Sequence, residues 1–91
     1  MIPELLVQLG DAPPVVSRLN VASMKKVMDA IGPDTADADS FDFMAAHAYY
    51  GTGDRPIATL DEIYEWADRE QVKVLATRQP ENPTWPDRSG A

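Results

Sequence analysis

The sequence predicts a mainly all-α fold, a small bundle of three to four short helices. Two stretches with an apolar stripe at helical spacing begin after good N-cap residues, Asn20 and Thr59. A third stretch, residues 41–50, is apolar on both faces, which is typical of a central helix. Because 91 residues suffice for only one core, we expect a single small helical domain over residues 1–78. A flexible or extended tail that contains prolines is expected over residues 79–91.

The composition limits the classes of protein that the chain can belong to. Hydrophobic residues make up 44% and charged residues 25% of the chain, close to the averages for globular proteins. The absence of cysteine excludes disulfides, thiolate catalysis and cysteine-ligated zinc. No stretch approaches the roughly 18–20 apolar residues that a membrane span needs, and the N-terminus lacks the features of a signal peptide. We therefore expect a cytoplasmic protein without membrane contact.

Negative charge is concentrated in the middle of the chain. The net charge is −7, and residues 33–70 hold ten acidic residues against Arg55 and Arg69, a local charge of −8. Such a surface repels a phosphate backbone, so we expect no direct binding of nucleic acid. Two interpretations of the acidic residues stay open, a solvated face that keeps the protein in solution or a surface that docks a basic partner.

The N-terminal segment, residues 2–10, is expected to form a short helix. Pro3 suits the first position of a helix, and the leucines that follow it recur at helical spacing. Pro13 and Pro14 then break the helix. Residues 15–19 are expected to be extended or irregular, so this part forms the irregular N-terminal segment of the predicted bundle.

Residues 21–31 are predicted to form an amphipathic helix. Asn20 caps its start, and Gly32 ends it. Met24 and Met28 lie four residues apart on its apolar stripe. They have two interpretations, packing in the core or a methionine-lined groove that binds partners.

The polar loop at residues 34–40 contains three aspartates, which are typical calcium ligands. Counted from Asp37, however, Asp42 stands where an EF-hand loop needs glycine, and Ala48 stands where it needs glutamate. We therefore expect no metal site, and we expect Ser40 or the residue before it to cap the next helix.

The helix predicted at residues 41–50 carries apolar side chains on two opposite faces. Phe41 and Met44 lie on one face, and Phe43 and Tyr50 lie on the other. Two interpretations are open. The helix is central in the bundle, or the face with Phe43 and Tyr50 is an exposed binding surface.

His47 is the only histidine, and it lies on the same face as Phe43. No second metal ligand accompanies it at helical spacing. No local pattern supplies the orienting group, serine or threonine that catalysis would need. We therefore predict no catalytic residues, no metal and no cofactor, and we expect His47 to be structural.

A capping box, Thr59 followed by Glu62, predicts a helix that starts at Leu60. Acidic residues cover its polar side. Trp66 lies at the margin of its apolar stripe, where it either covers the edge of the core or anchors an interface. Residues 71–77 fit a short strand or a frayed extension of this helix.

The order of these features from Leu19 to Asp68, about half of the chain, resembles tail assembly chaperones of long-tailed bacteriophages. Members often run from an amphipathic helix like 21–31, through an acidic loop, to an apolar aromatic helix like 41–50. Residues 59–63, Thr-Leu-Asp-Glu-Ile, are similar to their Thr-Leu-Glu-Glu-Val type of helix opening. The resemblance implies a scaffold-like chaperone that binds the tape measure and tail tube proteins, self-associates and is absent from the finished tail.

Together these observations predict a non-enzymatic protein-interaction module that acts as a tail assembly chaperone. The alternative is an acidic inhibitor, of anti-defence or nucleic-acid-mimic type, that blocks a basic groove of a host protein. A chaperone holds apolar segments of its client, whereas a mimic binds through carboxylates with a steep salt dependence. The predicted partner-binding residues are Phe43, His47, Tyr50, Glu62, Glu65 and Trp66.

Overall fold

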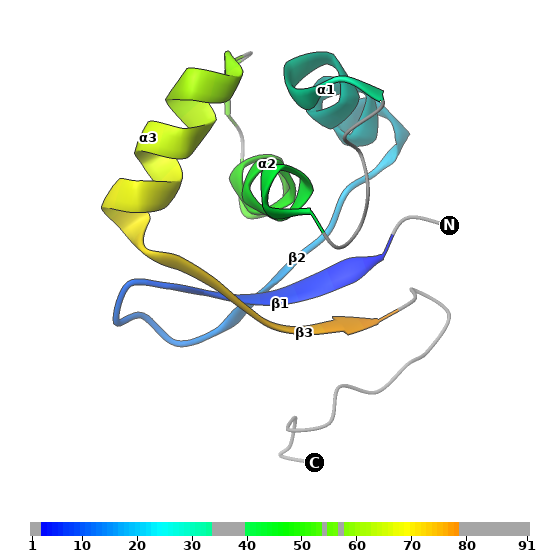
Figure 1. Cartoon of the computed structure of the whole chain (residues 1–91). Helices are drawn as coiled ribbons and strands as arrows, with labels where there is room; N and C mark the ends of the chain where they lie inside the picture. Colours follow the sequence, from blue (N-terminus) through cyan, green and yellow to red (C-terminus); the bar gives the residue numbers. More distant parts are fainter. Residues whose placement is uncertain (1–2, 34–39, 54, 57, 79–91) are drawn as a thin grey trace.

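In the part of the chain that the structure describes, a three-stranded antiparallel sheet forms one layer of the fold, and three helices cover one of its faces (Figure 1). The computed structural model describes residues 3–33, 40–53, 55–56 and 58–78. In chain order the elements are β1 (Glu4–Leu9), β2 (Val15–Ser17), α1 (Val21–Ile31), α2 (Phe41–Gly51), α3 (Leu60–Glu70) and β3 (Val72–Arg78). The tail expected at residues 79–91 and the aspartates of the loop before Ser40 lie outside the described residues.

The architecture is α+β, so the prediction of an all-α bundle is wrong. The segment expected to be an N-terminal helix is β1, the central strand of a sheet with the order β2-β1-β3. Leu5 and Val7 belong to the core under the helices, and Leu6, on the opposite face of the strand, is buried as well. A strand with apolar residues on both faces shows no alternation in its sequence, and its leucines also match helical spacing.

The two outer strands both pair with β1 in antiparallel register. Leu6 lies opposite Val16 of β2 and opposite Ala76 of β3. A bulge beside this pair makes Leu75 an extra residue on β3, and its side chain is exposed. Of the two alternatives for residues 71–77, the strand is confirmed.

The three helices begin where the sequence predicts. In each, the N-cap side chain accepts a hydrogen bond from the backbone N–H three residues further on. The pairs are Asn20 with Ser23, Ser40 with Phe43, and Thr59 with Glu62. α3 ends at Glu70, and the left-handed backbone of its C-cap Gln71, with φ of 54°, turns the chain directly into β3.

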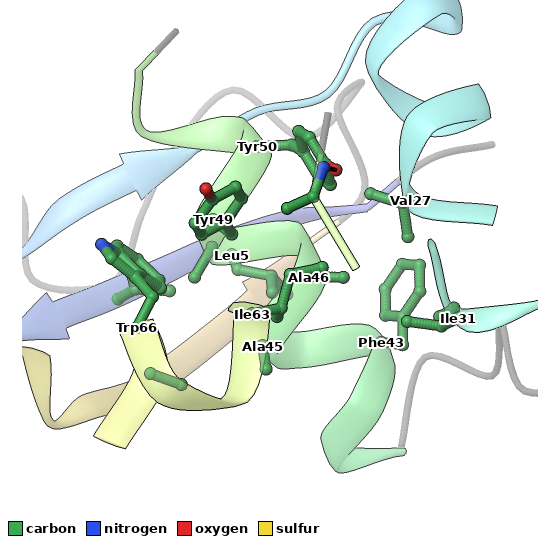
Figure 2. Close-up of a cluster of buried hydrophobic side chains, with 14 residues drawn as sticks. Leu5, Val27, Ile31, Phe43, Ala45, Ala46, Tyr49, Tyr50, Ile63 and Trp66 are labelled. Atoms are coloured by element: carbon green, nitrogen blue, oxygen red, sulfur yellow. Dashed lines mark hydrogen bonds between the residues drawn. The ribbon is translucent and has the colours of Figure 1, made fainter. Parts of the chain in front are cut away.

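α2 lies between α1 and α3, over the sheet (Figure 1). Most of its side chains are buried, and Figure 2 shows Phe43, Tyr49 and Tyr50 among the core residues. This helix is therefore central, as one of the two interpretations expected, but it lies over a sheet and not in a helical bundle. The alternative with an exposed Phe43 and Tyr50 face does not hold. Phe41, which that alternative placed in the core, is 65% exposed.

An ion-pair network joins all three strands at one end of the sheet. The carboxylate of Glu4, in β1, accepts hydrogen bonds from Nε of Arg18 at 2.7 Å and from Nε of Arg78 at 2.9 Å. Burial alone would raise the pKa of Glu4, but the two guanidinium groups outweigh burial and hold the pKa below its ordinary value. Because Arg18 follows β2 and Arg78 ends β3, the network fixes both outer strands to the central one.

Candidate functional site

The structure divides the six predicted partner-binding residues into two groups. Four are core side chains, namely Phe43, His47, Tyr50 and Trp66. The other two, Glu62 and Glu65, are exposed on α3. The buried four present no surface to a partner in this fold, while the partner-binding role of the two glutamates stays a prediction.

The aromatic residues of the core find their partners inside the protein. Trp66 packs edge-on against Tyr49, with ring centroids 5.1 Å apart. The guanidinium of Arg55 lies 5.3 Å from the ring centroid of Trp66 and 5.6 Å from that of Tyr49. The hydroxyl of Tyr50 accepts a hydrogen bond from the backbone N–H of Ala58 at 3.2 Å. Of the two interpretations of Trp66, the structure shows the one that places it in the core.

His47 is the centre of a buried polar network. Its Nε2 lies 2.9 Å from the carbonyl oxygen of Pro3, and because a carbonyl only accepts, Nε2 is the donor. Its Nδ1 lies 2.7 Å from Oγ of Ser17, which also lies 2.9 Å from the carbonyl oxygen of His47. The network joins the middle of α2 to the residue before β1 and to the last residue of β2.

A serine hydroxyl beside an imidazole is also the arrangement of a nucleophile and its general base. Ser17 and His47 both have an exposed fraction of 0%. Neither residue is part of the lining of the two surface grooves described below. A substrate has no access to Oγ of Ser17, so we interpret the pair as structural. No local sequence pattern could have revealed it, because the two residues are 30 positions apart.

The stability of the protein is expected to fall as the pH is lowered from about 7.5 to about 5.5. Burial lowers the pKa of His47, although hydrogen bonds to the carbonyls of Pro3 and of His47 itself oppose the effect. The histidine of the unfolded chain takes up a proton near its ordinary pKa of 6.5, while the folded chain resists protonation to a lower pH. The contribution of neutral His47 to stability is therefore complete above the ordinary pKa of 6.5, and it is lost as the pH falls from there toward the folded-state pKa. Urea unfolding across this range measures the change.

The matched control for this pH dependence is His47→Gln. Its amide can still form hydrogen bonds, but it does not titrate. The variant is expected to be less stable than wild type at every pH and to show a flatter profile over the same range. A wild-type stability that rises as the pH falls would contradict the assignment.

The outer face of α1 carries an apolar groove of about 430 Å³. This α1 groove is lined by Val21, Met24, Lys25, Met28, Asp29 and Pro33. Val21 is 84% exposed, whereas Met24 is partly buried and also packs against the core. Lys25 and Asp29 pair with each other, with Nζ 3.2 Å from Oδ2. Met24 therefore packs against the core and also lines the groove, while the binding of a partner by these methionines stays a prediction.

A second groove, of about 500 Å³, lies where the start of α2 meets the end of α3 and the start of β3. This α2–α3 groove is lined by Phe41, Tyr64, Ala67, Asp68, Gln71 and Val72. The rings of Phe41 and Tyr64 stack, with centroids 5.8 Å apart and planes inclined by 16°. The hydroxyl of Tyr64 donates a hydrogen bond to Asp42. The sequence did not reveal this groove, because it depends on Phe41 pointing outward.

Two carboxylates, those of Asp42 and Asp61, act on the hydroxyl of Tyr64. The hydrogen bond to Asp42 raises the pKa of the Tyr64 hydroxyl, and burial and the charges of Asp42 and Asp61 raise the pKa further. A third carboxylate, that of Asp68, belongs to the lining of the groove itself. The α2–α3 groove therefore combines exposed aromatic surface with negative charge.

Comparison with known proteins adds no further evidence about function. No family model, no curated protein and no solved structure matches this chain. Among the described residues, no cluster of three or more histidine, aspartate or glutamate side chains could hold a metal ion. None of the helices in this part of the chain has the length and apolar character of a membrane span.

Proposed function

We propose that the chain is a non-enzymatic protein-interaction module of the tail assembly chaperone type. It holds an apolar segment of the tape measure protein or the tail tube protein while the phage tail is assembled in the host-cell cytoplasm. The resemblance of residues 19–68 to such chaperones supports the choice of client. Self-association, which the same resemblance implies, is part of the proposal.

The α1 groove is the observation that supports this proposal most. Its surface is mostly apolar, and Val21 at its edge is almost fully exposed. Methionine side chains such as Met24 and Met28 are unbranched and flexible, so they can repack around different apolar side chains. A client segment that covers the groove removes this apolar surface from water, which favours binding.

Val21→Asp is expected to weaken client binding by about tenfold or more, because the client would desolvate the new carboxylate. The fold should stay intact, since position 21 is exposed and an acidic residue in the first turn of a helix is favourable. The variant and the wild type are each co-expressed with the tape measure protein, and separately with the tail tube protein, of the phage that encodes the chain. Co-purification and titration calorimetry measure the complex.

Ala22→Asp is the matched control, because it adds the same charge to the neighbouring exposed residue outside the groove. It is expected to bind the client like wild type. If both variants lose the same affinity for the client, the added charge and not the α1 groove is the cause. If neither protein forms a complex with the wild-type chain, the chaperone proposal is rejected.

One observation favours the alternative of an acidic inhibitor. α3 presents a set of exposed carboxylates, namely Asp61, Glu62, Glu65 and Asp68. A contact through these groups should weaken steeply with added salt. Binding to a basic host protein that survives Val21→Asp, but is lost in salt and in a Glu62→Gln, Glu65→Gln double variant, would favour the inhibitor over the chaperone.

A further inference from the structure

We propose that the α2–α3 groove binds an arginine side chain of a partner protein, in a segment that places an apolar residue beside the arginine. The groove is built from α2, α3 and β3, whereas the α1 groove is lined by residues of α1 and by Pro33. The helix α2 lies between α1 and α3 (Figure 1). The α2–α3 groove is therefore a binding surface separate from the α1 groove, and its proposed role does not depend on the chaperone proposal.

The stacked aromatic pair is the first argument for an arginine. Phe41 is 65% exposed, so the ring that stacks on Tyr64 is also open to solvent. A planar guanidinium packs well on an aromatic ring, through both the attraction of the cation to the π electrons and plain stacking. The chain itself contains such a contact, since Arg55 lies over the rings of Tyr49 and Trp66.

Charge complementarity is the second argument. Asp68 lines the groove, and Asp42 and Asp61 act on the hydroxyl of Tyr64. None of the residues that line the groove is a lysine or an arginine, so a cation from a partner would meet no like charge in the lining. A guanidinium can stack and donate two parallel hydrogen bonds to a carboxylate, whereas an ammonium group is only a point charge. The groove therefore favours arginine over lysine.

The remaining lining explains why we expect an apolar neighbour. The lining also includes the partly buried Val72, which adds apolar surface beside the aromatic pair, and the buried Ala67. The volume of about 500 Å³ lies within the usual range for ligand pockets, roughly 300–1,000 Å³. An aliphatic side chain next to the arginine would cover this surface and exclude water from the ion pair, which strengthens the charged hydrogen bonds.

The test uses a short capped peptide with the sequence Leu-Arg-Leu, titrated into the ¹⁵N-labelled full chain and followed by NMR. Amide shifts are expected at Phe41, Tyr64 and Asp68, with a dissociation constant of about 1 mM. A Leu-Lys-Leu peptide is expected to bind about threefold more weakly or worse. Replacing arginine by citrulline, which has a similar shape but no charge, is expected to reduce affinity about tenfold.

Matched variants locate the site. Asp68→Asn and Phe41→Ala are each expected to weaken peptide binding several-fold. Glu62→Gln removes the same charge as Asp68→Asn from another exposed position on α3 outside the groove, and it should leave the affinity unchanged. Val21→Asp, which alters the α1 groove, should also leave it unchanged.

Three results would overturn the proposal. The first is the absence of shifts at these residues at about 5 mM peptide. The second is equal affinity for the arginine and lysine peptides, or equal losses in Asp68→Asn and Glu62→Gln, which would indicate only general attraction to acidic protein. The third is a monomer–dimer equilibrium that Phe41→Ala abolishes while the peptide causes no shifts, since a second copy would then occupy the groove.

Discussion

Tyr50→Asp is expected to unfold the protein, whereas Phe41→Asp leaves it folded. Tyr50 is 7% exposed, and its ring packs edge-on against Tyr49 with centroids 5.1 Å apart. Its hydroxyl also accepts the hydrogen bond of Ala58. A carboxylate at this position would be buried without a partner and would leave a cavity, at a cost of about 4 kcal/mol or more. Thermal melting followed by circular dichroism measures the effect, and we expect little helix signal from Tyr50→Asp at room temperature.

Phe41→Asp is the control on the same helix. The change removes an exposed ring and its stacking on Tyr64, so we expect a cost of about 1 kcal/mol or less. Tyr50→Phe keeps the ring and removes only the hydroxyl, which should cost about 1 kcal/mol. If Phe41→Asp unfolds the chain while Tyr50→Asp melts like wild type, α2 does not bury the Tyr50 face and its orientation over the sheet is wrong.

Gly51→Ala is expected to destabilise the protein by about 3 kcal/mol. A Cβ atom at position 51 would overlap Oγ of Ser17 and lie 3.0 Å from the backbone nitrogen of Arg18 and 3.2 Å from its carbonyl oxygen. The same backbone nitrogen donates a hydrogen bond to the carbonyl oxygen of Gly51 at 3.3 Å, so α2 and β2 are held at this close approach. The side chain of Ser17 cannot rotate away from the new Cβ atom without losing its hydrogen bond to His47. Urea unfolding measures the change in the free energy of unfolding.

The expected loss of stability in Gly51→Ala is opposite in sign to the effect that helix propensity alone would have. Alanine in place of glycine normally stabilises a helix by about 1 kcal/mol, so a loss of stability identifies the close approach as its cause. Gly53→Ala is the control, because a Cβ atom there would have no atom within 4 Å, and it should be nearly neutral. A Gly51→Ala variant that is as stable as wild type would show that α2 and β2 are further apart.

The helices could be predicted from the sequence because their signals are local. Asn20, Ser40 and Thr59 each stand just before an apolar or amphipathic stretch, and each accepts the capping hydrogen bond that its position indicates. The strands could not be predicted in the same way, because their evidence is not local. β1 contains leucines at spacings that fit a helix, and it is defined as a strand only by its pairing with β2 and β3.

The candidate site was predictable only in part. Burial of Phe43 and exposure of Phe41 depend on the position of α2 between α1, α3 and the sheet, which the periodicity of an all-apolar helix does not specify. The hydrogen-bond partner of His47 is Ser17, which is 30 positions away in the sequence, so no local pattern indicates the pair. The exposure of Glu62 and Glu65, in contrast, could be predicted from the capping box and the apolar stripe of α3.

The central position of β1 has a consequence for how the chain folds as it is synthesised. β1 is synthesised before the other described elements, but β3, its longer partner, is made only after the three described helices. The paired residues Glu4 and Arg78 are 74 positions apart. Until then β1 can pair only with the three residues of β2, and its other edge stays open. Closing so long a loop slows folding relative to a helical bundle of similar size. The nascent chain therefore exposes an apolar strand edge, the kind of surface that aggregates, until almost the whole domain has been made.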